Sequence, residues 1–282
     1  MKEKLCYLIL TVLLLVSCQT GNLTDPGSTT STTLADLDFN QITFEKYFTG
    51  GAYSMAKTDD ESILLVGTTY NHTNKFELNS DILLIKIGKK LNVVWKKTFG
   101  EAVFDCGYSI CKTNDNNYLI CAARGDASTS NGGVAGVLIK IDKDGNKIVE
   151  KTIPSSRVFS GFDITPTSDN GFIICGMKNS YNTPMRQELF DPMQYDDKNV
   201  NLFYMKINES LDVEWQKEIK DHNCSAFFRG IETNDGDYLF TGLLDGKEPW
   251  LSSFYVIKTD KNGNTVWEYK YPEISSSNGV YA

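Results

Sequence analysis

The sequence predicts an all-β protein made of four repeated units, each with four antiparallel strands, and three observations support this prediction. First, the 282 residues are rich in Gly (22), Tyr (14) and Phe (15) and poor in Pro (7), which favours strands and turns. Second, the same pair of hairpins recurs along the chain. Third, no segment has the apolar spacing of an amphipathic helix.

The first hairpin of each unit has a nearly constant turn. A Thr recurs at one turn position, and an Asp follows two places later in every unit. The Asp carboxylate can accept backbone N–H groups, and the Asn or Gly beside it tolerates a positive φ, so the turn suits a tight hairpin. These turn positions are Thr58, Thr113, Thr167 and Thr233, with Asp60, Asp115, Asp169 and Asp235.

The second hairpin repeats in step with the first. Its third strand has an apolar run ending in a Lys, as expected for a strand covered on both faces, and its fourth strand carries a large residue at a fixed place. Both columns advance by 54, 66 and 52 residues, so the two hairpins form one unit. The columns are Lys86, Lys140, Lys206 and Lys258, then Trp95, Val149, Trp215 and Trp267.

Four-stranded antiparallel units at a period near fifty residues are typical of a β-propeller, in which the sheets, called blades, stack around an axis. A β-sandwich or an open solenoid is the alternative. We expect the Trp column to be structural and to fill the space between neighbouring blades. We also expect the Lys column to pair with acids of the fourth strand, such as Glu150 or Glu268.

The ends of the repeat region are incomplete copies. We expect four full units between a lone fourth strand and a short stub that matches only the start of a first strand. Either four blades close tightly, or the sequence is a truncated part of a larger ring, which we favour because a stop within a strand leaves an exposed edge. The predicted bounds are 42–52 for the lone strand, 53–107, 108–161, 162–227 and 228–278 for the units, and 279–282 for the stub.

The N-terminus predicts a lipoprotein. A charged start precedes an apolar run that is too short to span a bilayer, so residues 1–17 have the form of a signal peptide. The run ends in Leu-Val-Ser-Cys, which resembles the bacterial lipobox. The resemblance implies cleavage before Cys18 and acylation of Cys18 with chains such as palmitate, although an ordinary secretory signal is the alternative. Gln19 follows, which by the same resemblance favours an outer-membrane address. Residues 18–40 are rich in Ser, Thr and Gly and predict a flexible tether before the propeller at 41–282.

The repeat motif resembles those of secreted and lipid-anchored propellers of Bacteroidetes-type bacteria. Its best copy here is Thr233–Gly242 followed by Ile257–Tyr269. It is also distantly similar to pyrroloquinoline-quinone-type propellers, which include quinone dehydrogenases and a non-enzymatic assembly lipoprotein. The resemblance implies a propeller fold and, by itself, no activity.

Composition excludes several classes of function. A formal charge of −8 argues against a nucleic-acid partner. Two His and no clustered ligands argue against a metal site, and no motif indicates a cofactor, so we expect neither. Among the seven Cys, those beyond the signal and Cys18 have no paired spacing, which favours buried thiols over disulfides. No catalytic residue is identified.

The loops between the second and third strands vary most among units, and such loops lie on one face of a propeller. They carry aromatic and Arg side chains of the kinds found at binding hot spots. The candidate binding residues are Tyr70, Phe76, Tyr181, Arg186, Phe190, Tyr195 and Trp250.

The sequence therefore predicts a non-enzymatic binding or scaffold module, anchored to the bacterial envelope through Cys18, with a protein or glycan partner. The alternative is a quinone-type or glycan-processing enzyme, or a remnant of one, with its site on the axis. That alternative requires convergent charges at the starts of the first strands. Those positions read Ser54, Ser109, Asp163 and Arg229, which are not of one charge type. The oligomeric state is left open.

Overall fold

The protein is described from a computed structural model. Its described residues are 50–71, 79–100, 104–126, 133–153, 158–179, 200–220, 226–245, 251–271 and 274–275.

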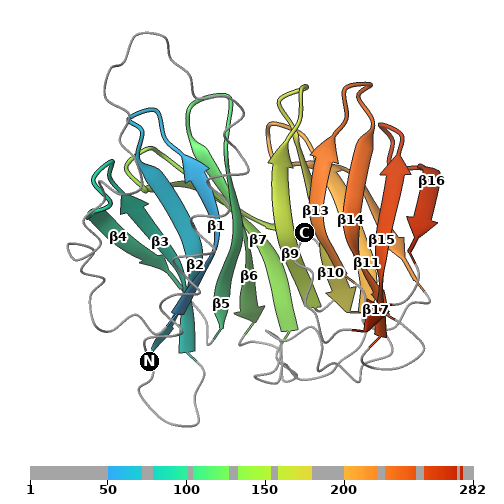
Figure 1. The fold of residues 1–282 in the computed structure, drawn as a ribbon. Coiled ribbons are helices and arrows are strands. Elements are labelled where there is room, and N and C mark those ends of the chain that lie inside the picture. The colour runs from blue at the N-terminus through green and yellow to red at the C-terminus, as the bar shows by residue number, and fades with distance from the viewer. Residues whose placement is uncertain are drawn as a thin grey trace, which may run out of the picture. The chain divides into compact units, whose positions relative to one another are not determined.

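These residues form four four-stranded antiparallel sheets, which confirms the predicted all-β class (Figure 1). The first strands are β1 (Gly50–Lys57), β5 (Asp105–Lys112), β9 (Val158–Pro166) and β13 (Ala226–Glu232). The second strands are β2 (Ile63–Asn71), β6 (Tyr118–Asp126), β10 (Phe172–Asn179) and β14 (Tyr238–Asp245). The third strands are β3 (Asn79–Ile87), β7 (Gly133–Ile141), β11 (Val200–Ile207) and β15 (Leu251–Thr259). The fourth strands are β4 (Val93–Phe99), β8 (Lys147–Ile153), β12 (Val213–Ile219) and β16 (Thr265–Lys270).

Consecutive sheets meet through their first strands. β5 contacts β1, β9 contacts β5, and β13 contacts β9, so these four inner strands line one side of the stack. A parallel bridge from Ser80 to Phe104 links the first two sheets, and the parallel pair Val134–Val158 links the second and third. A short β17 (Ile274–Ser275) pairs with the start of β15.

The hydrophobic core consists of layers between neighbouring sheets. Leu64 and Ile82 of the first sheet share a buried cluster with Ile120 of the second. Leu138 and Phe203 belong to the cluster between the second and third sheets, and the third and fourth share another aromatic-rich cluster. The second and third strands are thus covered on both faces, which is the physical reason for their nearly continuous apolar runs.

The hairpin turns follow the predicted chemistry. In the first hairpin of the first sheet, Thr58 N donates to Ser62 O and Glu61 N donates to Thr58 O, with Glu61 at φ 60°. This is a three-residue loop closed by a left-handed residue. The left-handed positions in all eight turns are Glu61, Leu91, Asn116, Gly145, Asn170, Leu211, Gly236 and Gly263.

All four first strands begin before the predicted unit bounds. Residues 50–52, assigned to a lone fourth strand, begin β1, because Gly50 to Ala52 pair with Gly67 to Thr69 of β2. The other inner strands likewise start two to four residues before the predicted unit bounds of 108, 162 and 228. The predicted segments 1–17, 18–40 and 279–282, and residues 42–49 of the predicted lone strand, lie outside the described residues.

Candidate functional site

The inner strands bring one polar residue from each sheet into a row. We call this row the inner-strand quartet: Ser54 on β1, Ser109 on β5, Asp163 on β9 and Arg229 on β13. The sequence analysis found the column but treated its mixed chemistry as a sign that no site forms there. The structure shows that the four side chains are hydrogen-bonded neighbours.

A bulge before each quartet residue sets its position. In every sheet the register between the first and second strands shifts by one residue, and the extra residue of the first strand at each shift is Tyr53, Tyr108, Phe162 or Phe228. A bulge re-aims the side chains beside it. The second strand has a small residue at the shift. A β-carbon added at Gly67 would lie 1.9 Å from Gly51 O, and one added at Gly242 would lie 2.0 Å from Ala226 O.

The first three quartet residues are linked through hydroxyl groups. The Ser54 and Ser109 Oγ atoms are 3.5 Å apart, and Ser54 Oγ accepts the backbone N–H of Ile110 at 3.3 Å. Ser109 Oγ then donates to Asp163 Oδ1 at 3.2 Å. The chain of contacts therefore crosses three sheets.

Asp163 is the centre of the quartet. Its side chain is 6% exposed, and Arg229 Nη1 donates to its Oδ1 at 2.9 Å. Its Oδ2 accepts the N–H of Gly230 at 3.1 Å and the hydroxyl of Thr165 at 3.3 Å. The carboxylate thus accepts four hydrogen bonds, counting Ser109, and joins the inner strands of three sheets.

Aromatic rings form a second row beside the quartet. The ring centroids of Tyr53 and Tyr108 are 6.3 Å apart, those of Tyr108 and Phe162 are 5.2 Å apart, and those of Phe162 and Phe228 are 5.6 Å apart. These separations are typical of favourable tilted and edge-to-face pairs. Tyr53 at one end of the row is 42% exposed, and the Arg229 side chain at the far end of the quartet is 49% exposed.

The buried thiols next to the quartet have raised pKa values. Burial raises the pKa of Cys111, Cys121 and Cys175 well above the ordinary thiol range, and the Asp163 carboxylate adds to the rise. Cys121 and Cys175 lie directly opposite Ser109 and Asp163 in the neighbouring strands. All four described cysteines, including Cys106, are free and buried, as predicted. Such thiols stay protonated and unreactive.

The Lys column has a different role from the predicted one. Lys86, Lys140, Lys206 and Lys258 pair with the turn residues Asp60, Asp115, Asp169 and Asp235 at 2.5 to 2.9 Å. The predicted pairing with fourth-strand acids holds only in part, because Lys206 also pairs with Glu214 of β12 at 3.4 Å, whereas the two acids named in the prediction have other partners. Glu150 instead pairs with Arg124 and Lys147, and Glu268 accepts the hydroxyl of Tyr255.

The Lys column pairs with the turn Asp residues because the Thr of each Thr-x-Asp turn orients the Asp carboxylate towards the end of the third strand. Thr167 Oγ1 donates to Asp169 Oδ1 at 2.6 Å, and the same Thr-to-Asp bond recurs in every sheet. Burial alone would raise the pKa of Asp169, but hydrogen bonds from Thr167 and Lys206 outweigh it and lower the pKa to about 2. The repeated Thr, Asp and Lys therefore clamp each pair of hairpins together.

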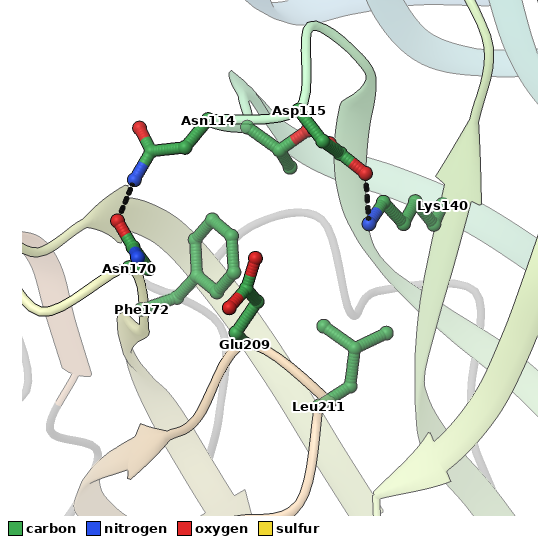
Figure 2. A pocket seen from close by; sticks show the side chains of 8 residues that line it. Asn114, Asp115, Lys140, Asn170, Phe172, Glu209 and Leu211 are labelled. Atoms are coloured by element: carbon green, nitrogen blue, oxygen red, sulfur yellow. Dashed lines mark hydrogen bonds and ion pairs between the residues drawn. The ribbon is translucent and has the colours of Figure 1, made fainter.

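A small hollow lies between the turns of the second and third sheets (Figure 2). The Asp115–Lys140 ion pair borders it, and Asn114 donates across it to Asn170. Its cavity volume of about 10 Å³ is comparable to the space needed for one water molecule. This hollow is too small for an organic ligand, so its residues serve to join two sheets.

The Trp column divides into two environments. Trp95 packs against Gly145 of the next sheet and Trp215 packs against Gly263 of the next sheet, as expected for residues between blades. Trp267 differs from the expectation, because it is 46% exposed. Its strand, β16, is the last in the order of the fourth sheet, and no further sheet follows among the described residues.

The predicted binding loops cannot be placed. Phe76, Tyr181, Arg186, Phe190, Tyr195 and Trp250 lie outside the described residues, as does the predicted lipid-attachment residue Cys18. Tyr70 is placed only as a backbone position near the end of β2, opposite Ser80.

The described ranges contain no cluster of three or more His, Cys, Asp or Glu that could hold a metal ion. In the same ranges, no helix has the length and apolar character needed to cross a membrane. In the turn from Asp142 to Asn146, Asp142 Oδ1 accepts the N–H groups of Asp144 and Asn146, and Asn146 Oδ1 accepts a hydrogen bond from Lys97 of the first sheet.

Sequence reasoning missed the quartet because it did not predict the bulge. A signal was present in the second strands, where Gly67, Ala122, Gly176 and Gly242 form a column of small residues. Small residues at one strand position indicate a close backbone approach. This column of small residues would have predicted a bulge beside the quartet residues.

No protein-family model matches the chain, and no curated protein matches it in sequence. Solved structures do match, at low identity. A polysaccharide lyase of family PL25, an ulvan lyase, has a TM-score of 0.50 at 10% identity, over 80% of this chain and 56% of its own. A Bacillus megaterium levansucrase mutant has a TM-score of 0.46 at 7% identity, over 77% of this chain and 69% of its own. The Pyrococcus horikoshii acylaminoacyl peptidase has a TM-score of 0.43 at 15% identity, over 83% of this chain. The chain spans about a third of that peptidase, 34% of its length. The fold is thus similar to that of β-propeller proteins.

Proposed function

We propose that the protein is a non-enzymatic binding or scaffold module, held at the bacterial envelope by lipid on Cys18, with the inner-strand quartet at the centre of its binding surface. The partner is a protein or a glycan. The observation that carries the proposal is the state of Asp163, a buried carboxylate whose hydrogen-bonding capacity is taken up by the protein itself.

Asp163 is poorly suited to proton transfer. A general acid or base must exchange its proton with a substrate, and glycoside hydrolysis ordinarily needs two carboxyl groups facing one bond. Asp163 is the one carboxylate of the quartet and is held by Ser109, Thr165, Arg229 and Gly230. This arrangement supports a positioning role rather than a catalytic one.

The exposed ends of the two rows support recognition. Arg229 is fixed at Nη1 by Asp163 while about half of its side chain remains exposed. A guanidinium that is already oriented loses less entropy when it binds a ligand. Tyr53 offers an exposed ring on the first sheet. Arg and Tyr are residue types enriched among binding hot spots.

The binding proposal is tested with the full chain in detergent, probed against a panel of envelope polysaccharides and acidic or neutral oligosaccharides by calorimetry. We expect at least one polymer to bind and Arg229→Gln to weaken its Kd about tenfold or more, an effect of about 1.4 kcal/mol. The matched control is Lys261→Gln, an exposed cation in the turn between β15 and β16. Equal effects of the two substitutions would contradict a role for the quartet, and turnover of a polymer that Asp163→Asn abolishes would favour the enzyme alternative.

The anchor is tested separately by the intact mass of the protein extracted from its native membrane. We expect a mature chain that begins at Cys18 and carries acyl groups. A mass without acyl groups would contradict the anchor and would leave the binding proposal standing.

A further inference from the structure

The three sheet-to-sheet interfaces follow a rule of complementary volume. In two of them a Trp on the fourth strand meets a glycine in the next sheet's second turn. A β-carbon at Gly145 would lie 2.6 Å from Trp95 Cη2, and one at Gly263 would lie 2.8 Å from Trp215 Cε3. Both glycines have a φ of 76°, so the ring occupies space that only glycine leaves free.

At the remaining interface, between the second and third sheets, the fourth-strand residue is small and the turn residue is large. The fourth-strand column has Val149 in the second sheet, and the left-handed turn residue in the third sheet is Leu211, with φ 63°. Lys151 Nζ lies 2.7 Å from Asp212 Oδ1 and 2.6 Å from Ser210 O, so this strand and this turn are adjacent. A smaller column residue therefore accompanies a larger turn residue.

The fourth sheet presents a large column residue that meets no turn glycine of the described sheets. All six residues of β16 are exposed, and Val266, Trp267 and Tyr269 are 55%, 46% and 54% exposed. Tyr271, just beyond the strand, is 45% exposed. Because side chains alternate along a strand, Trp267, Tyr269 and Tyr271 belong to one row. An exposed apolar row of this kind marks an interaction surface.

The rule determines what this surface accepts. Trp267 requires a turn with glycine at the left-handed position, yet the two such glycines in the second turns of the described sheets, Gly145 and Gly263, already lie under Trp95 and Trp215. The first sheet has Leu91 at that position, with φ 60°. Neither the first sheet of this chain nor that of a second copy therefore fits.

We propose that the face of β16 docks a further propeller sheet, distinct from the four described sheets, and that this sheet carries glycine at the left-handed position of the turn between its third and fourth strands. Docking continues the series of interfaces already present between the four sheets. Trp267 then packs on that glycine as Trp215 packs on Gly263.

The test uses a second copy of residues 226–278 fused after Asn278, so that a glycine-turn sheet follows β16. In the copy, the residue that corresponds to Trp267 is changed to Phe, which makes the original Trp267 unique. The readout is the rate of tryptophan oxidation at each position, mapped by peptide mass spectrometry. We expect oxidation of Trp267 to slow at least fivefold in the fusion, towards the rate at Trp215.

The matched control is the same fusion with Gly263→Leu in the copy alone. We expect its Trp267 to oxidise within twofold of the rate in the unextended chain. Equal protection in both fusions, or none in the glycine fusion when it melts cooperatively, would overturn the proposal.

Two measurements on the unextended chain keep the proposal testable if the fusions do not fold. We expect Trp267→Lys to leave the melting temperature unchanged and Trp215→Lys to lower it. An equal decrease in melting temperature in the two variants would show that Trp267 is already covered. Light scattering in detergent must give the same oligomeric state for the parent and for Trp267→Lys. A dimer that this substitution abolishes would assign the face to a second copy and overturn the proposal.

Discussion

Lys206 Nζ lies 2.9 Å from Asp169 Oδ2, although the Lys206 side chain is only 1% exposed. The buried ammonium also lies 3.2 Å from the carbonyl oxygen of Ile207 and 3.4 Å from Glu214 Oε2. A buried cation without a partner is strongly destabilising, so the turn carboxylate, as the nearer of two acids, stabilises Lys206 there. This pair is the most buried of the four Lys–Asp clamps.

The clamp predicts the effect of removing its acid. We expect Asp169→Ala to lower the free energy of unfolding by about 1–3 kcal/mol, below the full value for a buried pair because half of Asp169 is exposed to water. Urea denaturation followed by circular dichroism measures the change. The matched control is Asp144→Ala in an exposed turn, which should cost less than about 0.5 kcal/mol. Equal losses in the two variants would refute the clamp.

The clamps also predict a loss of stability in acid. The pKa values of Asp169 and Asp235 are lowered to about 2, and those of Asp60 and Asp115 are lowered as well, with the Lys and Thr of each clamp donating to the carboxylate. An unfolded Asp titrates near pH 3.9, so the unfolded chain binds more protons below that pH. The stabilisation is therefore complete above about pH 5 and is lost progressively as the pH falls to 2. Urea midpoints measured from pH 6 to pH 2 check this, and Asp169→Asn should flatten the decline. A midpoint that is constant over this range would contradict it.

The four-sheet architecture was predictable because the residues of each repeat determine their own turns and strands. Thr233 and Asp235 specify a turn through their side chains and Gly236 through its freedom to adopt a positive φ, while the apolar run before Lys206 specifies a strand covered on both faces. Each of these signals acts within one hairpin. The prediction of strands and turns from such signals was confirmed.

The quartet and the clamps were not predictable in the same way. A bulge at Phe162 changes which face Asp163 takes, and one residue of register reverses every side chain in a strand. The partner of Lys206 likewise depends on how far its stem extends towards a turn thirty-seven residues earlier. Contacts between elements distant in sequence need the register, which the pattern of a single strand does not fix.

Thiol burial gives a further prediction. Burial raises the pKa of Cys106 to about 12, and the pKa values of Cys111, Cys121 and Cys175 are also raised for that reason. We expect none of these four to be alkylated by iodoacetamide at pH 8 in the folded protein, and all four to react in urea. Peptide mass spectrometry assigns the sites. Modification of Cys121 in the folded state would show that the layer between the second and third sheets opens.

The complementary volumes at the interfaces predict that substitutions at Val149 and Leu211, which are far apart in sequence, have strongly coupled effects on stability. Val149→Trp alone should destabilise the protein by about 1–3 kcal/mol, because its ring meets a turn that carries Leu211. Leu211→Gly alone should also destabilise, since Leu211 is 6% exposed in the core between the second and third sheets. Together they recreate the Trp–Gly pair of Trp95 and Gly145, so the double variant should be more stable than the sum of the single effects by at least about 1 kcal/mol. The matched control combines Val149→Trp with Asn116→Gly, a left-handed position in a first-hairpin turn. Additive effects in the Leu211 cycle would show that the alternation of Trp with Gly and Val with Leu has no energetic basis.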